Sequence, residues 1–199
     1  MQRTRPSCLS SGISSTINNA FVCKEEMQEK YPDAEICVFD SICASGGHGL
    51  LIYHAIENKK KGMSVKENMQ ALEELKHRIV HKFTVDDLTY LQRGGRISKT
   101  AAVIGGMIQL KPVLHVDTEG RLAAESKVRG RKKALNQLLA EMDICTGSYA
   151  DKQDVVLICH ADCPEDAEYV RAKVEEKYHP NKIIMSEVGP IVGNDGTYF

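Results

Sequence analysis

This sequence lacks an excess of charge of either sign. It carries 26 Lys and Arg against 27 Asp and Glu, for a formal net charge of -1. Nucleic-acid binding rests largely on positive surfaces that neutralise phosphates, so this balance removes the electrostatic argument for DNA or RNA as the main partner. With 199 residues, the chain is long enough to bury a core as one large domain or two small ones.

Long apolar runs and paired cysteine motifs are also missing. No stretch is long enough to span a bilayer, and the opening MQRTRPS lacks the apolar centre of a signal peptide, so we expect no stable membrane insertion. The seven cysteines are scattered and mostly in apolar surroundings, which favours reduced thiols in a cytoplasmic protein. Cys159, His160 and Cys163 come nearest to a metal cluster, but no second ligand pair with zinc spacing accompanies them, so no metal is expected.

Helix and strand patterns alternate in the first part of the chain. Apolar residues recur at helical spacing from Ser14 and stop before Pro32, and AEICVFDS is a short apolar run typical of a strand buried on both faces. A glycine-bearing loop then enters a helix that ends near Gly62, and a capping box at 64–67 opens another helix. This alternation indicates a layered α/β domain.

The pattern changes after His81. The following segment predicts a short helix, a basic glycine loop, a second helix reaching Leu110, a hairpin turning at 117–120 and a helix at about 132–142. DVVLICH and KIIMSEVGPIVG predict strands on either side of a helix opened by Pro164. We therefore predict a layered α/β domain at residues 1–82, followed by a separate α+β domain at residues 83–199.

Five hydroxyl side chains gather in CLSSGISSTINNA, immediately before the first helix. One serine would suffice to cap that helix. Several hydroxyls beside Gly12, at a helix end whose dipole favours negative charge, also suit a carboxylate or a phosphate. A serine nucleophile is a third alternative, although no G-x-S-x-G turn or adjacent base accompanies it. Composition alone leaves capping and anion binding open.

Two basic clusters raise a parallel question. Arg93 and Arg96 flank two glycines. Their guanidinium groups can donate two hydrogen bonds to a carboxylate or phosphate, and the glycines let the backbone approach such a ligand closely. The simpler alternative is a solvated turn. The second cluster is most simply a solvated face that could meet an acidic partner, and it consists of Lys127, Arg129, Arg131, Lys132 and Lys133. Spacing alone does not choose between these alternatives.

Five motifs in order resemble those of the DegV family of bacterial fatty-acid-binding proteins. LSSGISSTINNA resembles the family's L-S-S-x-L-S-G-T-Y-x-x-A, and VFDSICASGGHGLLIYHA resembles its D-S-x-x-x-S-x-G-x-G. FTVDDLTYLQRGGRIS, IQLKPVLHVDTEGRL and KVRGRKKAL resemble its V-D-D-L-x-Y-L-x-x-G-G-R-I, K-P-I-L and R-G-x-K-K-A stretches. Each motif is weak alone, whereas five in register are specific.

The resemblance implies a fatty-acid carrier with a place in phospholipid metabolism. It also implies a partial parallel α/β/α layer domain followed by a smaller α+β domain with a mixed sheet. A long-chain fatty acid would lie between the two domains, with no cofactor and no intrinsic chemistry, and would be presented to a separate ATP-dependent fatty acid kinase. The family binds the carboxylate with hydroxyls, with an arginine and a histidine nearby. We assign the hydroxyls to Ser14, supported by Ser11 and Thr16, and the arginine to Arg93. Arg96 and Arg129 would then face the kinase.

The sequence departs from the family pattern at both ends. The family's opening D-S motif and T-S-x-P-S turn have no counterpart before Ser7, and GPIVGNDGTYF stands where its H-T-G-P-G motif would follow. We therefore expect a chain shortened at its N-terminus and altered or cut at its C-terminus, with exposed sheet edges. The alternative functions are a phosphotransferase domain related to dihydroxyacetone kinases, whose fold the family shares, and a fragment that binds no ligand. No G-x-x-x-x-G-K-[ST] loop supports the enzyme, and His48 reads as a structural or polar lining residue rather than a catalytic one.

Overall fold

A computed structural model of the chain describes residues 7–98, 110–189 and 192. These residues fall into two compact units. Unit 1 takes in the chain up to Ile79 together with Asp117–Arg121, and unit 2 takes in Val80–Val116 and the chain from Leu122 onward. Both units combine helices with short sheets, which is the mixed α/β class that the sequence predicts. The helix predicted to reach Leu110 falls on residues 99–109, outside the described part.

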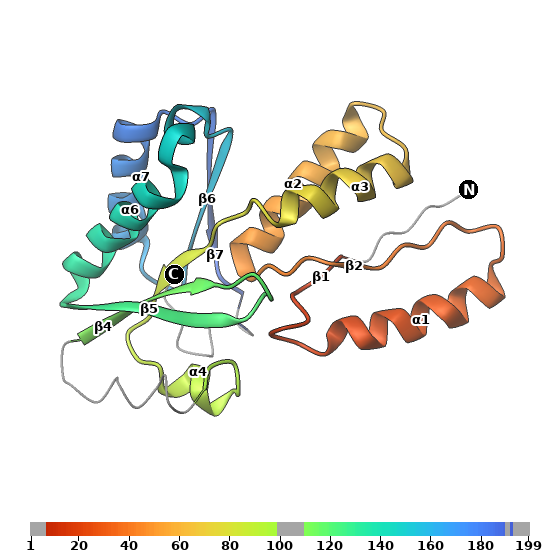
Figure 1. Cartoon of the computed structure of the whole chain (residues 1–199), viewed down its shortest axis with the longest axis horizontal. Helices are drawn as coiled ribbons and strands as arrows, with labels where there is room; N and C mark the ends of the chain where they lie inside the picture. Colours follow the sequence, from red (N-terminus) through yellow and green to blue (C-terminus); the bar gives the residue numbers. More distant parts are fainter. Residues whose placement is uncertain (1–6, 99–109, 190–191, 193–199) are drawn as a thin grey trace. The chain divides into compact units, whose positions relative to one another are not determined.

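Unit 1 places a small parallel sheet between helices (Figure 1). Strand β2 pairs with β1 through Phe39 and Asp40, so the run AEICVFDS forms a much shorter strand than its apolar pattern indicates. The elements in chain order are β1 (Ser7–Cys8), α1 (Thr16–Lys30), β2 (Phe39–Asp40), α2 (Ser45–Lys60) and α3 (Val65–Lys76).

The capping box predicted at 64–67 is confirmed at the start of α3. The Ser64 hydroxyl accepts the N–H of Glu67 at 3.3 Å, and the Glu67 carboxylate accepts the N–H of Ser64 at 2.8 Å. The two reciprocal bonds satisfy donors that a helix end otherwise leaves unpaired. Helix α3 then packs its apolar stripe with α2 around a buried cluster of Phe39, Cys43, Leu51 and Leu72.

Helix α1 confirms the helix that the apolar spacing predicts. It buries Ile17, whereas Phe21 and Met27 are 46% and 45% exposed. The β1–β2 sheet, two residues long in each strand, offers too little surface to cover a helix of 15 residues.

Unit 2 contains an antiparallel sheet of order β3-β4-β5 and a parallel pair β6-β7. The hairpin predicted at 117–120 joins β4 and β5, and the helix predicted at 132–142 is α6. The elements are β3 (Lys82–Thr84), α4 (Thr89–Arg93), β4 (Leu110–Val116), β5 (Leu122–Arg129), α6 (Arg131–Thr146), η1 (Gly147–Lys152), β6 (Val155–His160), α7 (Pro164–Tyr178) and β7 (Lys182–Glu187).

Unit 2 has two features that the sequence analysis did not specify. Within the described residues, its antiparallel and parallel strand pairs lie in separate sheets. Strand β3 had no counterpart in the sequence analysis because three residues are too few to show a period. Phe83 of this strand nevertheless joins the core of unit 2, with Val85, Leu88, Leu91, Ile97 and Leu114.

Charged side chains of unit 2 meet where α6 packs on the antiparallel sheet. The Lys82 amino group donates to Glu125 at 2.5 Å and to Glu141 at 3.4 Å, and Gln137 donates to Glu141 at 2.8 Å. His115 Nδ1 lies 3.7 Å from Glu125. Because Glu141 is buried, its charge depends on these partners, and the network ties β3, β5 and α6 together.

Candidate ligand-binding site

The loop Ser10–Thr16, named the serine loop below, brings hydroxyls together at the start of α1. Ser14 Oγ and Thr16 Oγ1 are 2.8 Å apart, and Ser14 Oγ accepts the N–H of Thr16 at 3.2 Å. Ser15, at the N-cap, makes no capping bond with its side chain. The Ser14 hydroxyl therefore lies at the amino end of the helix, whose first turn carries no acidic residue and whose dipole favours an anion.

Ser11 is tied to the end of strand β2. Its N–H donates to Asp40 Oδ1 at 3.1 Å, and the N–H of Ile42 donates to the same oxygen at 3.1 Å. Burial alone would raise the pKa of the Asp40 carboxyl, but hydrogen bonds from the Ser11 side chain and from these two backbone groups, with Lys76 nearby, lower it. Asp40 therefore stays ionised and anchors Ser11.

The three hydroxyls assigned to the carboxylate site thus lie in one loop of unit 1. Ser14 is half-buried, whereas Ser11 and Thr16 are exposed. Exposed hydroxyls can turn toward a ligand, while the Ser14 hydroxyl is held by Thr16. Each hydroxyl has one O–H to donate, and one of this pair donates to the other, so the arrangement offers an acidic head group the remaining O–H at a helix N-terminus.

Ser10 is a structural residue of the site that the sequence analysis did not single out. Its side chain is fully buried, and its hydroxyl donates to the carbonyl of Gly120 at 2.7 Å. Gly120 lies in the turn of the β4–β5 hairpin, a separation of 110 residues. No local sequence pattern indicates such a contact, although the sequence predicts Gly120 as the last residue of the turn at 117–120.

The two arginines of the basic glycine loop belong to unit 2 and are exposed. The guanidinium carbon of Arg93 lies 5.8 Å from the centre of the Tyr90 ring, and Arg96 donates to the carbonyl of Gly94 at 2.7 Å. Gly95 between them has φ +72°, a left-handed conformation that glycine adopts without steric cost. Arg96 is therefore held by its own loop, whereas Arg93 rests on an aromatic ring of α4.

The second basic cluster divides in a way that its sequence does not show. Arg129, Lys132 and Lys133 are exposed, as a solvated face requires. Arg131, in contrast, donates through Nε to Asp166 at 2.7 Å, and the amino group of Lys127 is buried with no hydrogen-bond partner. The interpretation of all five as one solvated face is therefore wrong for Arg131 and Lys127, because the strand and helix turn these two side chains inward.

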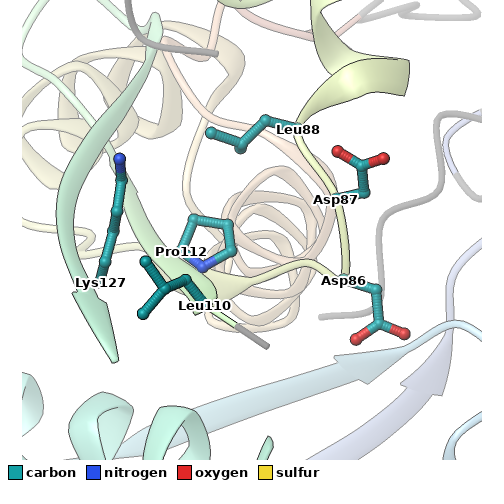
Figure 2. A pocket seen from close by; sticks show the side chains of 6 residues that line it. All are labelled: Asp86, Asp87, Leu88, Leu110, Pro112 and Lys127. Atoms are coloured by element: carbon teal, nitrogen blue, oxygen red, sulfur yellow. The ribbon is translucent and has the colours of Figure 1, made fainter. Parts of the chain in front are cut away.

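Lys127 lines a small hollow in unit 2 with Leu88, Leu110 and Pro112 (Figure 2). Asp86 and Asp87 complete the lining, and Lys111 donates to Asp86 at 2.6 Å. The hollow measures about 250 Å³ including space open to solvent. Because that volume includes open solvent, the hollow by itself does not enclose a long-chain lipid.

Other chemistry is weakly represented in the described part of the chain. Within residues 7–98 and 110–189, no group of three His, Cys, Asp or Glu side chains could hold a metal ion. All seven cysteines are free thiols, and burial raises the pKa of Cys43 to about 12, which keeps that thiol protonated and a poor nucleophile. None of the helices described is both long and apolar enough to cross a membrane.

Comparison with known proteins identifies the family that the motifs suggested. Residues 8–194 match the model of the DegV family of uncharacterised proteins. A DegV domain-containing protein of Clostridium perfringens is 41% identical over 185 residues, and another of Lactococcus lactis is 35% identical over 195 residues. The alignments cover 93% and 94% of this chain but 63% and 65% of those proteins, so the chain spans about two thirds of their length.

Solved structures agree with the fold. A stearic acid-binding protein of Eubacterium ventriosum superimposes with a TM-score of 0.85 at 27% identity, covering 97% of this chain and 66% of that one. The fatty acid kinase B3 protein of Streptococcus pneumoniae, solved with linoleic acid, superimposes with a TM-score of 0.86 at 18% identity, covering 96% and 67%. The second likeness concerns the fold alone.

Proposed function

Because this chain belongs to the DegV family, we propose that it serves to bind a long-chain fatty acid and acts as a carrier, with no catalysis of its own. The observation that carries the proposal is the pair of hydroxyls of Ser14 and Thr16, 2.8 Å apart at the N-terminus of α1, within the family's serine motif. The stearic acid-binding structure of a relative supports the ligand class.

We assign the carboxylate to Ser14, with Ser11 and Thr16 in support and Arg93 as the cationic partner. Hydroxyl donors and a guanidinium are the groups that a carboxylate binds most strongly in proteins. The serine loop itself contains no cation, so a fully bound carboxylate needs a positive side chain from elsewhere in the chain. The acyl chain needs a long apolar cleft, and the hollow of unit 2, which is open to solvent, does not enclose one.

We further propose that the carrier presents its ligand to a fatty acid kinase in the cytoplasm. The name of the Streptococcus pneumoniae protein, fatty acid kinase B3 protein, suggests the partner. Arg96 and Arg129 are exposed basic residues of unit 2 and are assigned to that contact. The seven free cysteines agree with a reducing compartment.

The decisive test of ligand binding is a pair of substitutions in the serine loop. Ser14→Ala should lower the affinity for a fluorescent long-chain fatty acid about tenfold or more, because a hydrogen bond to a charged group contributes about 1.5–3 kcal/mol. Ser15→Ala is the matched control, since Ser15 is exposed and makes no capping bond. Mass spectrometry of organic extracts should find a fatty acid in the purified protein. Unchanged affinity in Ser14→Ala would remove Ser14 from the site.

The arginine assignments separate in two assays. Arg93→Ala should weaken fatty-acid binding directly, because it removes charge from the carboxylate. Arg96→Ala and Arg129→Ala should leave that affinity unchanged and slow acyl-phosphate formation with an added kinase, most strongly at low salt, because rim charges act on the encounter rate. Loss of binding in Arg96→Ala with none in Arg93→Ala would reverse the assignment.

A further inference from the structure

The turn of the β4–β5 hairpin, Asp117–Arg121, packs within unit 1 against the serine loop. This segment is named the hairpin tip below. The Ser10 hydroxyl connects the two segments, since it donates to the Gly120 carbonyl at 2.7 Å and accepts the N–H of Gly12 at 3.0 Å. The bond to Gly120 is shielded from water because Ser10 is fully buried, and the bond from Gly12 is part-buried. The hairpin tip therefore meets the serine loop at its most buried residue.

The backbone of Ser10 extends this connection to the proposed ligand site. Its N–H donates to the carbonyl of Cys43 at 3.1 Å, and its carbonyl accepts the N–H groups of Ile13 and Ser14, each at 3.0 Å. The amide of Ser14 is therefore bonded directly to Ser10. A displacement of Ser10 would move the backbone that carries the Ser14 hydroxyl.

The contact is too close to admit a side chain on either glycine. A Cβ on Gly12 would lie 2.8 Å from the carbonyl oxygens of Glu119 and Gly120. A Cβ on Gly120, where φ is +74°, would lie 2.0 Å from Ser10 Oγ and 3.0 Å from the Cα of Ile42. Such distances are well inside van der Waals contact, so the loop and the tip meet backbone to backbone.

The hairpin tip is organised by its own hydrogen bonds. Asp117 Oδ1 accepts the N–H groups of Glu119 and Arg121, both at 2.9 Å, and the Asp117 carbonyl accepts the N–H of Gly120 at 3.0 Å. Aspartate commonly fixes turns in this way. The tip thus presents the Gly120 carbonyl to Ser10 from a defined turn rather than from a loose loop.

We infer that the hairpin tip is a positioning element for the carboxylate site. Ser10 and Gly120 touch no ligand, and they hold the serine loop in the conformation that sets Ser14 Oγ against Thr16 Oγ1. The expected effect of the hairpin tip on fatty-acid affinity rests on the proposed function. The effect of the tip on the conformation of the serine loop does not depend on any ligand. A segment more than 100 residues away in sequence thereby determines how well the head group is held.

Hydrogen exchange without ligand tests the positioning directly. In Ser10→Ala, the amides of Ile13 and Ser14 should exchange at least tenfold faster than in the wild-type chain. Thr84→Val is the matched control, since the Thr84 hydroxyl is equally buried and donates to the Pro112 carbonyl at 2.7 Å, within unit 2. It should leave both amides unchanged. Asp117→Ala keeps the Ser10 side chain but loosens the turn that presents the Gly120 carbonyl to it, so it should also speed their exchange and serves where Ser10→Ala does not fold.

Affinity for a fluorescent long-chain fatty acid supplies the functional measurement. Ser10→Ala or Asp117→Ala should weaken binding by about tenfold, whereas Thr84→Val should stay within twofold of the wild-type chain. Unchanged exchange at Ile13 and Ser14 in the folded variants would overturn the inference whether or not the ligand binds. Faster exchange in the variants, together with a wild-type chain that binds no fatty acid, would support the positioning and refute the proposed function alone. Faster exchange with unchanged affinity would overturn the link to the site.

Discussion

Replacing Lys82 by methionine should lower the free energy of unfolding by about 2–3 kcal/mol. Removing one partner of a fully buried ion pair costs about 3–5 kcal/mol, and exposed pairs contribute about 0–1 kcal/mol. The Lys82 and Glu141 side chains are 13% and 10% exposed, whereas Glu125 is 31% exposed. The cost of removing Lys82 should therefore lie between the costs for a fully buried and a fully exposed ion pair. Most of this lost stability should come from the buried carboxylate of Glu141.

Methionine isolates the charge because it keeps most of the aliphatic stem of Lys82. Glu141 would retain the hydrogen bond from Gln137, and Glu125 would retain its contact with His115, so neither carboxylate would be left wholly without a partner. For a chain of this size, each kcal/mol shifts the melting temperature by about 2–4 °C. The variant should therefore melt about 4–12 °C below the wild-type chain.

Urea unfolding followed by circular dichroism measures the loss. Lys173→Met is the matched control, since Lys173 makes an exposed pair with Glu176 at 2.6 Å on α7, and it should change stability by less than about 0.5 kcal/mol. Adding Glu141→Gln to Lys82→Met should recover part of the loss, because it removes the uncompensated charge. A loss in Lys82→Met no larger than in the control, or strictly additive losses in the double variant, would refute the reasoning.

Three further predictions follow from single contacts. The hydrogen bond from Gln137, together with nearby positive charge, lowers the pKa of Glu141 in the folded chain. The ionised Glu141 carboxylate therefore stabilises the fold above about pH 4.3, and this stabilisation is lost as the pH falls through the lower pKa of the folded state. Glu141→Gln should reduce the pH dependence of the free energy of unfolding in urea across that range. Gly120→Ala should lower the melting temperature more than Gly95→Ala does. The φ angles of the two glycines are nearly equal, +74° at Gly120 and +72° at Gly95, but of these two only Gly120 has atoms within 4 Å of an added Cβ. Equal losses would contradict this. Ser64→Ala should cost about 1 kcal/mol in urea unfolding by removing the capping box, and a loss near zero would show that the box adds nothing.

The sequence determined the features that depend on neighbours along the chain. The capping box of Ser64 and Glu67 and the turn at 117–120 were visible because their partners lie three or four residues apart. The helices α1, α2, α3, α6 and α7 follow from apolar spacing and from proline and glycine at their ends. Membership of the DegV family was likewise available, since five motifs in order need no coordinates.

Tertiary structure decided whatever depends on residues distant in sequence. Only the fold pairs β3 with β4, turns Arg131 inward to Asp166 and leaves the apolar residue Phe21 of α1 exposed. The same holds for the contact of Ser10 with Gly120, which leaves no trace in either local segment. Periodicity reports which face of an element is apolar, whereas burial depends on what packs against that face, and this is set by the arrangement of the whole chain.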